Sequence, residues 1–137
     1  MPEGFHTLTP YLIVKEGEKA IAFYKSAFNA EELEKHLTEE NKVLHARLQI
    51  GDSQIMLSDE SDDTSCGNLT SPGQAQGTSC VLHMYVQDVD SSFQKAVSLG
   101  AKILIPVADM FWGDRYGQLQ DPFGHVWSLA THKENIE

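Results

Sequence analysis

The sequence has 137 residues, of which 41% are hydrophobic and 22% charged, and its formal net charge is −10. This length suits one domain or two small repeated units, and such a chain can bury about 68% of its unfolded surface, so folding requires neither a disulfide nor a metal. The negative charge argues against nucleic acid or an anionic membrane as a partner, and the lack of a long apolar run or a basic N-terminal leader predicts a cytoplasmic protein.

Residues 8–58 are predicted to form the first of two repeated units. A strand at residues 9–14 precedes a helix at 18–28, whose apolar side chains fall on one helical stripe, and Asn29 is a suitable C-terminal stop. Three strands are expected next, at 32–38, 43–50 and 54–58, because polar turn sequences separate them. The order of elements predicts a β-α-β-β-β unit.

Residues 59–78 are polar and small and include Gly and Pro, which is typical of a linker or a long surface loop. The same order of elements then recurs over residues 79–132. A strand at 79–86 is followed by a helix that Asp88 or Asp90 caps, that runs to Leu99 and that Gly100 ends. Strands at 102–107, 116–120 and 125–131 complete the second unit.

Asp121-Pro122-Phe123-Gly124 separates the last two predicted strands. Pro presets a turn, Gly adopts a positive φ and Asp bonds its own backbone, so this segment predicts a hairpin connection. Together with the two β-α-β-β-β units, it resembles the vicinal oxygen chelate superfamily, and most closely its PhnB-like branch of glyoxalase and bleomycin resistance proteins. The resemblance covers residues 8–132.

That resemblance implies an α+β fold of paired βαβββ modules, in which curled mixed sheets enclose a cleft within a single domain over residues 1–137. Module one would span residues 8–58 and module two residues 79–132. In this superfamily two modules, from one chain or from a dimer, complete each site, so a homodimer is expected. Two units that each place a helix on one sheet face leave the other face to pack or to line a cavity.

Strand alternation sorts the side chains between the helix face and the cleft face. In the strand at 43–50, the side chains expected to face the helix are Leu44, Ala46, Leu48 and Ile50, which leaves His45, Arg47 and Gln49 for the cleft. In the strand at 79–86, His83 and Tyr85 fall on the cleft face, opposite an apolar face of Cys80, Leu82, Met84 and Val86.

The residues predicted to bind a ligand are His45, Arg47, His83, Tyr85, Trp112, Tyr116, Gln118 and Ser128. A few polar groups among apolar walls suit a small molecule, and the aromatic members can stack on a planar one. The alternative is that these faces are simply solvated, as one face of an antiparallel sheet often is. Arg115 falls on the helix face by parity, but a bulge at Trp112-Gly113-Asp114 would reverse that assignment. Trp127 is expected to pack in the core or in an interface.

The resemblance also bears on metal binding. Metal-dependent members of the superfamily hold a divalent ion at positions that match Thr9, Met56, Val81 and Ser128 here, and none of these offers the imidazole or carboxylate that such an ion requires. His45 and His83 could substitute, but two imidazoles alone make a weak site. No cofactor is therefore expected, with a divalent metal as the disfavoured alternative.

The sequence thus predicts a PhnB-like protein that binds a small organic molecule without metal, and it leaves open whether the protein is an enzyme. The first alternative is a metal-dependent lyase or dioxygenase of the glyoxalase type. The second, a methyltransferase-like or nucleic-acid-linked role, is disfavoured by the acidic charge and by the absence of a Gly-rich cofactor loop. Arg47 would favour an anionic ligand, unless it pairs only with an acid such as Glu34.

Overall fold

We describe a computed structural model of the chain over residues 2–61, 70–73 and 77–133. The chain divides into two compact units, Met1–Gly73 and Gln74–Glu137. Each unit is described by itself below. No helix in the described part of the chain is long and apolar enough to cross a membrane.

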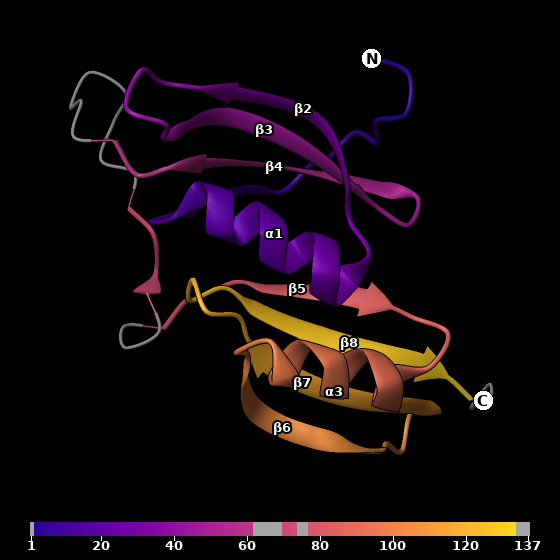
Figure 1. The fold of residues 1–137 in the computed structure, drawn as a ribbon. Helices are drawn as coiled ribbons and strands as arrows, with labels where there is room; N and C mark the ends of the chain where they lie inside the picture. Colours follow the sequence, from indigo (N-terminus) through magenta and orange to yellow (C-terminus); the bar gives the residue numbers. More distant parts are fainter. Residues whose placement is uncertain (1, 62–69, 74–76, 134–137) are drawn as a thin grey trace. The chain divides into compact units, whose positions relative to one another are not determined.

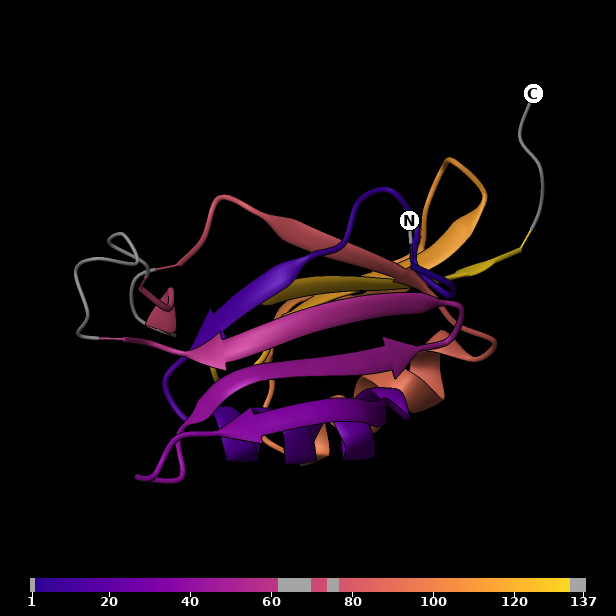
Figure 2. The same cartoon turned by 90° about the horizontal axis from the view of Figure 1, so that it is seen from above.

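Unit one is a four-stranded mixed sheet with one helix on one of its faces (Figure 1). Its elements are β1 (Tyr11–Val14), α1 (Gly17–Phe28), β2 (Glu31–Leu37), β3 (Val43–Ile50) and β4 (Ser53–Asp59). The strands lie in the order β1-β4-β3-β2, which Figure 2 shows side by side, with β1 and β4 parallel and the other pairs antiparallel. The buried stripe of α1 includes Ile21 and Tyr24, and α1 contacts β3 and β4, where Leu48 and Leu57 are fully buried.

The start of α1 is tied to the sheet by one carboxylate. Asp59, the last residue of β4, accepts hydrogen bonds from the backbone N–H of Gly17 (2.8 Å) and from that of Val43 (2.7 Å). An acidic group at a helix N-terminus satisfies an otherwise unpaired N–H and complements the helix dipole. A Cβ on Gly17 would lie 2.6 Å from Val43 Cγ2, so this close approach requires glycine.

Unit two repeats this architecture with β5 (Val81–Tyr85), α3 (Val89–Ser98), β6 (Lys102–Asp109), β7 (Asp114–Gln120) and β8 (Val126–His132). Its strand order is β5-β8-β7-β6, with β5 and β8 parallel as β1 and β4 are in unit one (Figure 1). Phe93 and Ala96 of α3 are buried on the same side of the sheet as Leu119 and Leu129. The backbone N–H of Val89, the first residue of α3, donates to Thr131 Oγ1 at 2.9 Å, as Gly17 donates to Asp59 in unit one.

The expected hairpin between β7 and β8 is confirmed, and a buried carboxylate holds it. Asp121 is fully buried, and its Oδ1 accepts from the backbone N–H groups of Phe123 (2.9 Å) and His125 (3.0 Å). Its Oδ2 accepts from Trp127 Nε1 at 2.9 Å. The carboxylate of Asp121 thus ties the turn to the buried indole of Trp127. Gly124 has the positive φ (97°) that the turn requires.

The α+β class and the paired βαβββ modules predicted from the sequence are confirmed, and both sheets are mixed. Asn29 ends α1 in the left-handed conformation, and Asp88 caps α3 by accepting from the N–H of Ser91. Most of the predicted linker, residues 62–69 and 74–76, lies outside the described residues.

The prediction that Leu44 faces the helix is wrong. Leu44 is 63% exposed, and Val43 is buried in its place. The cause is a register irregularity between β2 and β3, where His36 pairs with His45 but Leu37 pairs with Val43, so Leu44 is passed over. Such a bulge reverses the alternation of side chains beyond it. Cys80, expected on an apolar strand face, is exposed and precedes β5.

Candidate functional site

Each sheet has one face that its helix does not cover, which we call the open face. In unit two the strand register places His83, Ser128 and Gln118 in one row across this face, because His83 pairs with Ser128 and Ser128 with Gln118. Tyr85 and Tyr116 lie in the next such row, on either side of Ala130. The assignment of these five predicted ligand-binding residues to one face therefore agrees with the register.

Five rings of unit two form a continuous chain of contacts, which we call the ring platform. It runs Tyr85–His83 (centroids 4.7 Å apart), His83–Tyr116 (6.0 Å), Tyr116–Trp112 (5.5 Å) and Trp112–Phe111 (5.1 Å). Three of them are well exposed, Tyr85 at 62%, Phe111 at 88% and Trp112 at 42%. Exposed aromatic side chains gathered in one place are typical of a ligand or partner site.

A buried carboxylate links two rings of this platform, Tyr85 and Trp112. Asp114, the first residue of β7, is only 4% exposed. Its Oδ2 accepts hydrogen bonds from Tyr85 Oη and from Trp112 Nε1, each at 3.1 Å, and its Oδ1 lies 2.7 Å from His132 Nδ1. Asp114 thereby fixes the orientation of two exposed rings.

These contacts also set the protonation of the two acids involved. The hydrogen bond from His132 lowers the pKa of the Asp114 carboxyl, and those from Tyr85 and Trp112 add to this effect against desolvation, which opposes it. The same carboxylate raises the pKa of the Tyr85 hydroxyl. At neutral pH Asp114 is thus an anion, and Tyr85 is a protonated donor to it.

The two remaining predicted residues of this unit, Ser128 and Gln118, each form a hydrogen bond with a platform ring. His83 Nδ1 lies 2.7 Å from Ser128 Oγ, and Gln118 Nε2 donates to Tyr116 Oη at 3.2 Å. The buried hydroxyl of Ser128 therefore orients the ring of His83. Six of the eight predicted ligand-binding residues lie together in unit two, and the other two, His45 and Arg47, lie in unit one.

The open face of unit one repeats the tyrosine–histidine contact with the two residues exchanged. Tyr11 of β1 places its Oη 3.3 Å from Nδ1 of His45 on β3. In unit two the histidine, His83, is on the first strand and the tyrosine, Tyr116, is on the strand that corresponds to β3. Each open face thus carries at least one phenol in contact with an imidazole.

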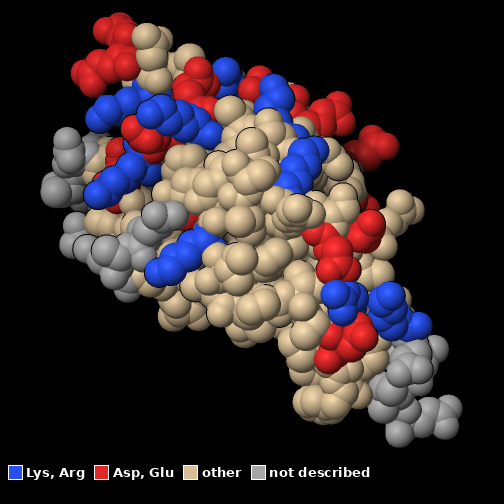
Figure 3. All heavy atoms as spheres, turned by 60° about the horizontal axis from the view of Figure 1, so that its bottom comes forward, with Lys and Arg blue, Asp and Glu red and all other residues tan. Residues whose placement is uncertain are grey.

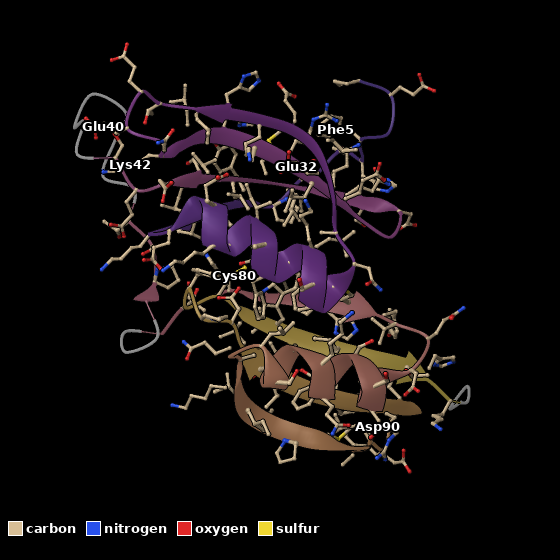
Figure 4. The ribbon with its side chains drawn as sticks, viewed as in Figure 1. Phe5, Glu32, Glu40, Lys42, Cys80 and Asp90 are labelled. Atoms are coloured by element: carbon tan, nitrogen blue, oxygen red, sulfur yellow. The ribbon has the colours of Figure 1, made fainter. Side chains whose placement is uncertain are left out.

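The side chain of Arg47 contacts three other residues of unit one. Its Nη1 donates to Gln54 Oε1 at 3.0 Å, and its Nη2 lies 3.4 Å from Glu34 Oε2. Its guanidinium carbon lies 5.3 Å from the centre of the Phe5 ring, on the N-terminal segment where Figure 4 labels that residue. The structure thus contains the ion pair with Glu34 that the sequence offers as the alternative role of Arg47. His36 first and Arg47 next lower the pKa of the Glu34 carboxyl, so that acid is charged at neutral pH.

Replacing Phe5 with alanine should expose the guanidinium of Arg47. We expect its modification by phenylglyoxal to become about two- to five-fold faster, as loss of a cation–π contact predicts. The sequence has two arginines, and Arg115, held by Asp90 and Asp109, is the internal control whose rate should stay constant. Mass spectrometry of the peptides measures both rates in one sample. Equal rates at Arg47 in the parent and the variant would show that Phe5 does not shield it.

The structure settles the orientation of Arg115 and Trp127. Arg115 reaches to Asp90 at the start of α3, labelled in Figure 4, with Nε 2.7 Å from Oδ2, so it faces the helix as its parity predicts. Two ion pairs raise the pKa of Arg115 further above its usual range. Trp127 is buried on the same side and donates to Asp121, which confirms its expected packing role.

The donor set does not fit a divalent metal. Of the four positions that the resemblance assigns to metal ligands, Met56 and Val81 offer no suitable atom, and the hydroxyl of Ser128 contacts His83. Over residues 2–61, 70–73 and 77–133, no three or more His, Cys, Asp or Glu side chains gather as a metal site would require. These positions therefore do not supply the imidazole or carboxylate ligands that a divalent ion requires.

Sequence reasoning missed two residues of this site, Asp114 and His132. Asp114 could have been found, because it lies two positions before Tyr116 and so shares its strand face. His132 could not, because its contact with Asp114 depends on the pairing of β7 with β8.

Comparison with known proteins gives one family and several relatives. The family model of the Glyoxalase/Bleomycin resistance protein/Dioxygenase superfamily matches residues 4–129. An uncharacterized protein of Mycobacterium tuberculosis is 41% identical over 123 residues, which cover 90% of this chain and 72% of that one.

Two solved structures show the same fold. The X-ray structure of an Arabidopsis thaliana gene product is 28% identical, with a TM-score of 0.71 and coverage of 92% of this chain and 98% of that one. A mutant of the fosfomycin resistance protein FosX from Listeria monocytogenes, complexed with Mn(II) and 1S,2S-dihydroxypropylphosphonic acid, is 19% identical. Its TM-score is 0.67, with coverage of 91% of this chain and 90% of that one.

Proposed function

The chain belongs to the glyoxalase/bleomycin resistance protein/dioxygenase superfamily, and on that premise we propose that it binds a small organic molecule on the open face of unit two. The observation that carries the proposal is the ring platform, in which five rings contact one another and three are well exposed. Exposed rings are costly to leave in water, and a planar ligand would cover them.

Two further features support this role. Asp114 and Ser128 hold the platform rings from below, and a surface whose side chains are already oriented loses less entropy when a ligand binds. The FosX complex with a small phosphonic acid shows that this fold can hold a small organic molecule, although its low identity carries no residue-level argument to this chain.

The proposal predicts where ligands bind. In a screen of small aromatic compounds by ¹H–¹⁵N NMR, we expect the shifted amide signals to cluster around Tyr85, Trp112 and Tyr116. Tyr116→Ala, which removes the central ring, should weaken such binding by about fivefold, since an aromatic contact contributes about 1 kcal/mol.

Tyr11→Ala in unit one is the matched control, because Tyr11 also contacts a histidine on an open sheet face. It should leave binding at the platform unchanged. Signals that shift only around Tyr11 and His45, or an unaltered affinity in Tyr116→Ala, would contradict the proposal.

A further inference from the structure

The ring platform also indicates the charge of its ligand. We propose that it binds a small organic cation, of the quaternary ammonium or protonated amine class, over the rings of Tyr85 and Trp112 beside Asp114. This inference rests on the proposed function of the open face of unit two and adds a ligand class to it.

The ring faces of the platform and the carboxylate of Asp114 both attract a positive charge. The faces of Tyr and Trp rings carry negative potential, and a cation within about 6 Å of a ring centre is attracted to it. Tyr85 and Trp112 both donate to Oδ2 of Asp114, so the two exposed rings converge on one buried anion. A buried carboxylate is screened less than an exposed one, which favours a positive ligand charge nearby.

In the part of unit two that the structure describes, the Lys and Arg side chains lie outside the platform. Lys95 is on α3, and the pKa of the Asp90 carboxyl is lowered by Arg115 and, to a lesser extent, by nearby Lys133. In the described part of unit two, no Lys or Arg makes an ion pair or a cation–ring contact with the platform. Arg115 is on the helix face, where it pairs with Asp90 and Asp109. Lys102 is on the open face but at its other end, opposite Gln120. His132, the remaining basic partner of Asp114, is positive only when protonated.

The net charge of the whole chain is negative, as is the charge of Asp114. The net charge is −10, and on the face drawn in Figure 3 most Lys and Arg side chains lie close to Asp or Glu side chains. An excess of negative charge attracts cations over long range and repels anions. The residue that favoured an anionic ligand, Arg47, is in unit one and already pairs with Glu34.

Three probes with one phenyl ring test the charge preference. These are phenyltrimethylammonium, benzenesulfonate and benzyl alcohol, which carry a positive, a negative and no charge. Each is titrated into the whole chain at pH 8, where fewer imidazoles are protonated than at neutral pH. Amide signals of unit two report the binding. We expect the cation to bind about five- to ten-fold more tightly than either of the other two.

Asp114→Asn should remove this preference while the neutral probe binds as before. Asp109→Asn is the matched control, because it removes one negative charge from an exposed position of the same unit. If Asp114→Asn does not fold, Tyr85→Phe, which keeps the ring but loses its hydrogen bond to Asp114, replaces it and should reduce the preference.

The outcomes separate the two proposals. Tighter binding of benzenesulfonate, or equal binding of all three probes at the platform, would overturn the cation proposal and leave the binding role of the platform intact. If none of the three probes shifts a signal of the platform, both proposals fail. A preference for the cation that persists unchanged in Asp114→Asn would also overturn the inference.

Discussion

Asp121→Ala is expected to lower the free energy of unfolding of unit two by about 3 kcal/mol. The substitution leaves three donors without their acceptor, the backbone N–H groups of Phe123 and His125 and the indole N–H of Trp127. Each buried donor left unpaired costs about 1–3 kcal/mol, and relaxation of the turn recovers part of the sum. Urea unfolding followed by circular dichroism measures the loss.

Asp121→Asn gives an intermediate case that identifies the cause. The amide oxygen can still accept from the two backbone donors, but its NH₂ group would face the donor of Trp127. We expect a loss of about 1–2 kcal/mol. Asp109→Ala, at an exposed position, should change stability by less than about 0.5 kcal/mol. A loss of that small size in Asp121→Ala would mean that water replaces the carboxylate without cost.

Gly17→Ala is the second substitution with a large expected effect, and its sign is opposite to what helix propensity predicts. Alanine in a helix is favoured over glycine by up to about 1 kcal/mol. Here the added Cβ would lie 2.6 Å from Val43 Cγ2 and 2.8 Å from Asp59 Oδ2. Relief of the overlap must move α1 away from the sheet and stretch the Gly17–Asp59 hydrogen bond.

We expect a net loss of about 2 kcal/mol in Gly17→Ala, because overpacking of this kind costs about 1–3 kcal/mol and the hydrogen bond adds to it. Ser26→Ala, on the exposed side of the same helix, is the control and should be neutral or slightly stabilising. Thermal unfolding of both variants measures the difference. A raised melting temperature in Gly17→Ala would show that the overlap is removed without strain.

The parts of the structure that depend on local sequence could be predicted, and those that depend on pairing between strands could not. The hairpin at Asp121 and the end of α1 at Asn29 follow from residue chemistry within a few positions. The alternation that places His83, Tyr85 and Tyr116 on one face is equally local. The sequence places Leu44 on the wrong face of its strand, because the register shift is in the pairing of β2 with β3 and the sequence of β3 alone does not reveal it.

The candidate site shows the same limit. The sequence places Trp112 and Tyr85 near a ligand, but their shared hydrogen bonding to Asp114 emerges only when the turn before β7 lies beside the end of β5. Likewise the sequence indicates Glu34 as a partner of Arg47, whereas the contact of Arg47 with Phe5 depends on where the N-terminal segment lies in the folded unit. Contacts between segments distant in sequence decide which charges a ligand would meet.

The two tryptophans of the chain lie in different surroundings within unit two, which has an optical consequence. Trp127 is buried and bonded to Asp121, whereas Trp112 is partly exposed at the platform. An indole in a dry, fixed environment emits at shorter wavelength than one that water can reach. Emission at short wavelength should therefore follow the folding of the hairpin, and emission at long wavelength, with its quenching by iodide, should follow the occupancy of the open face. A single fluorescence spectrum can separate loss of structure from gain of ligand.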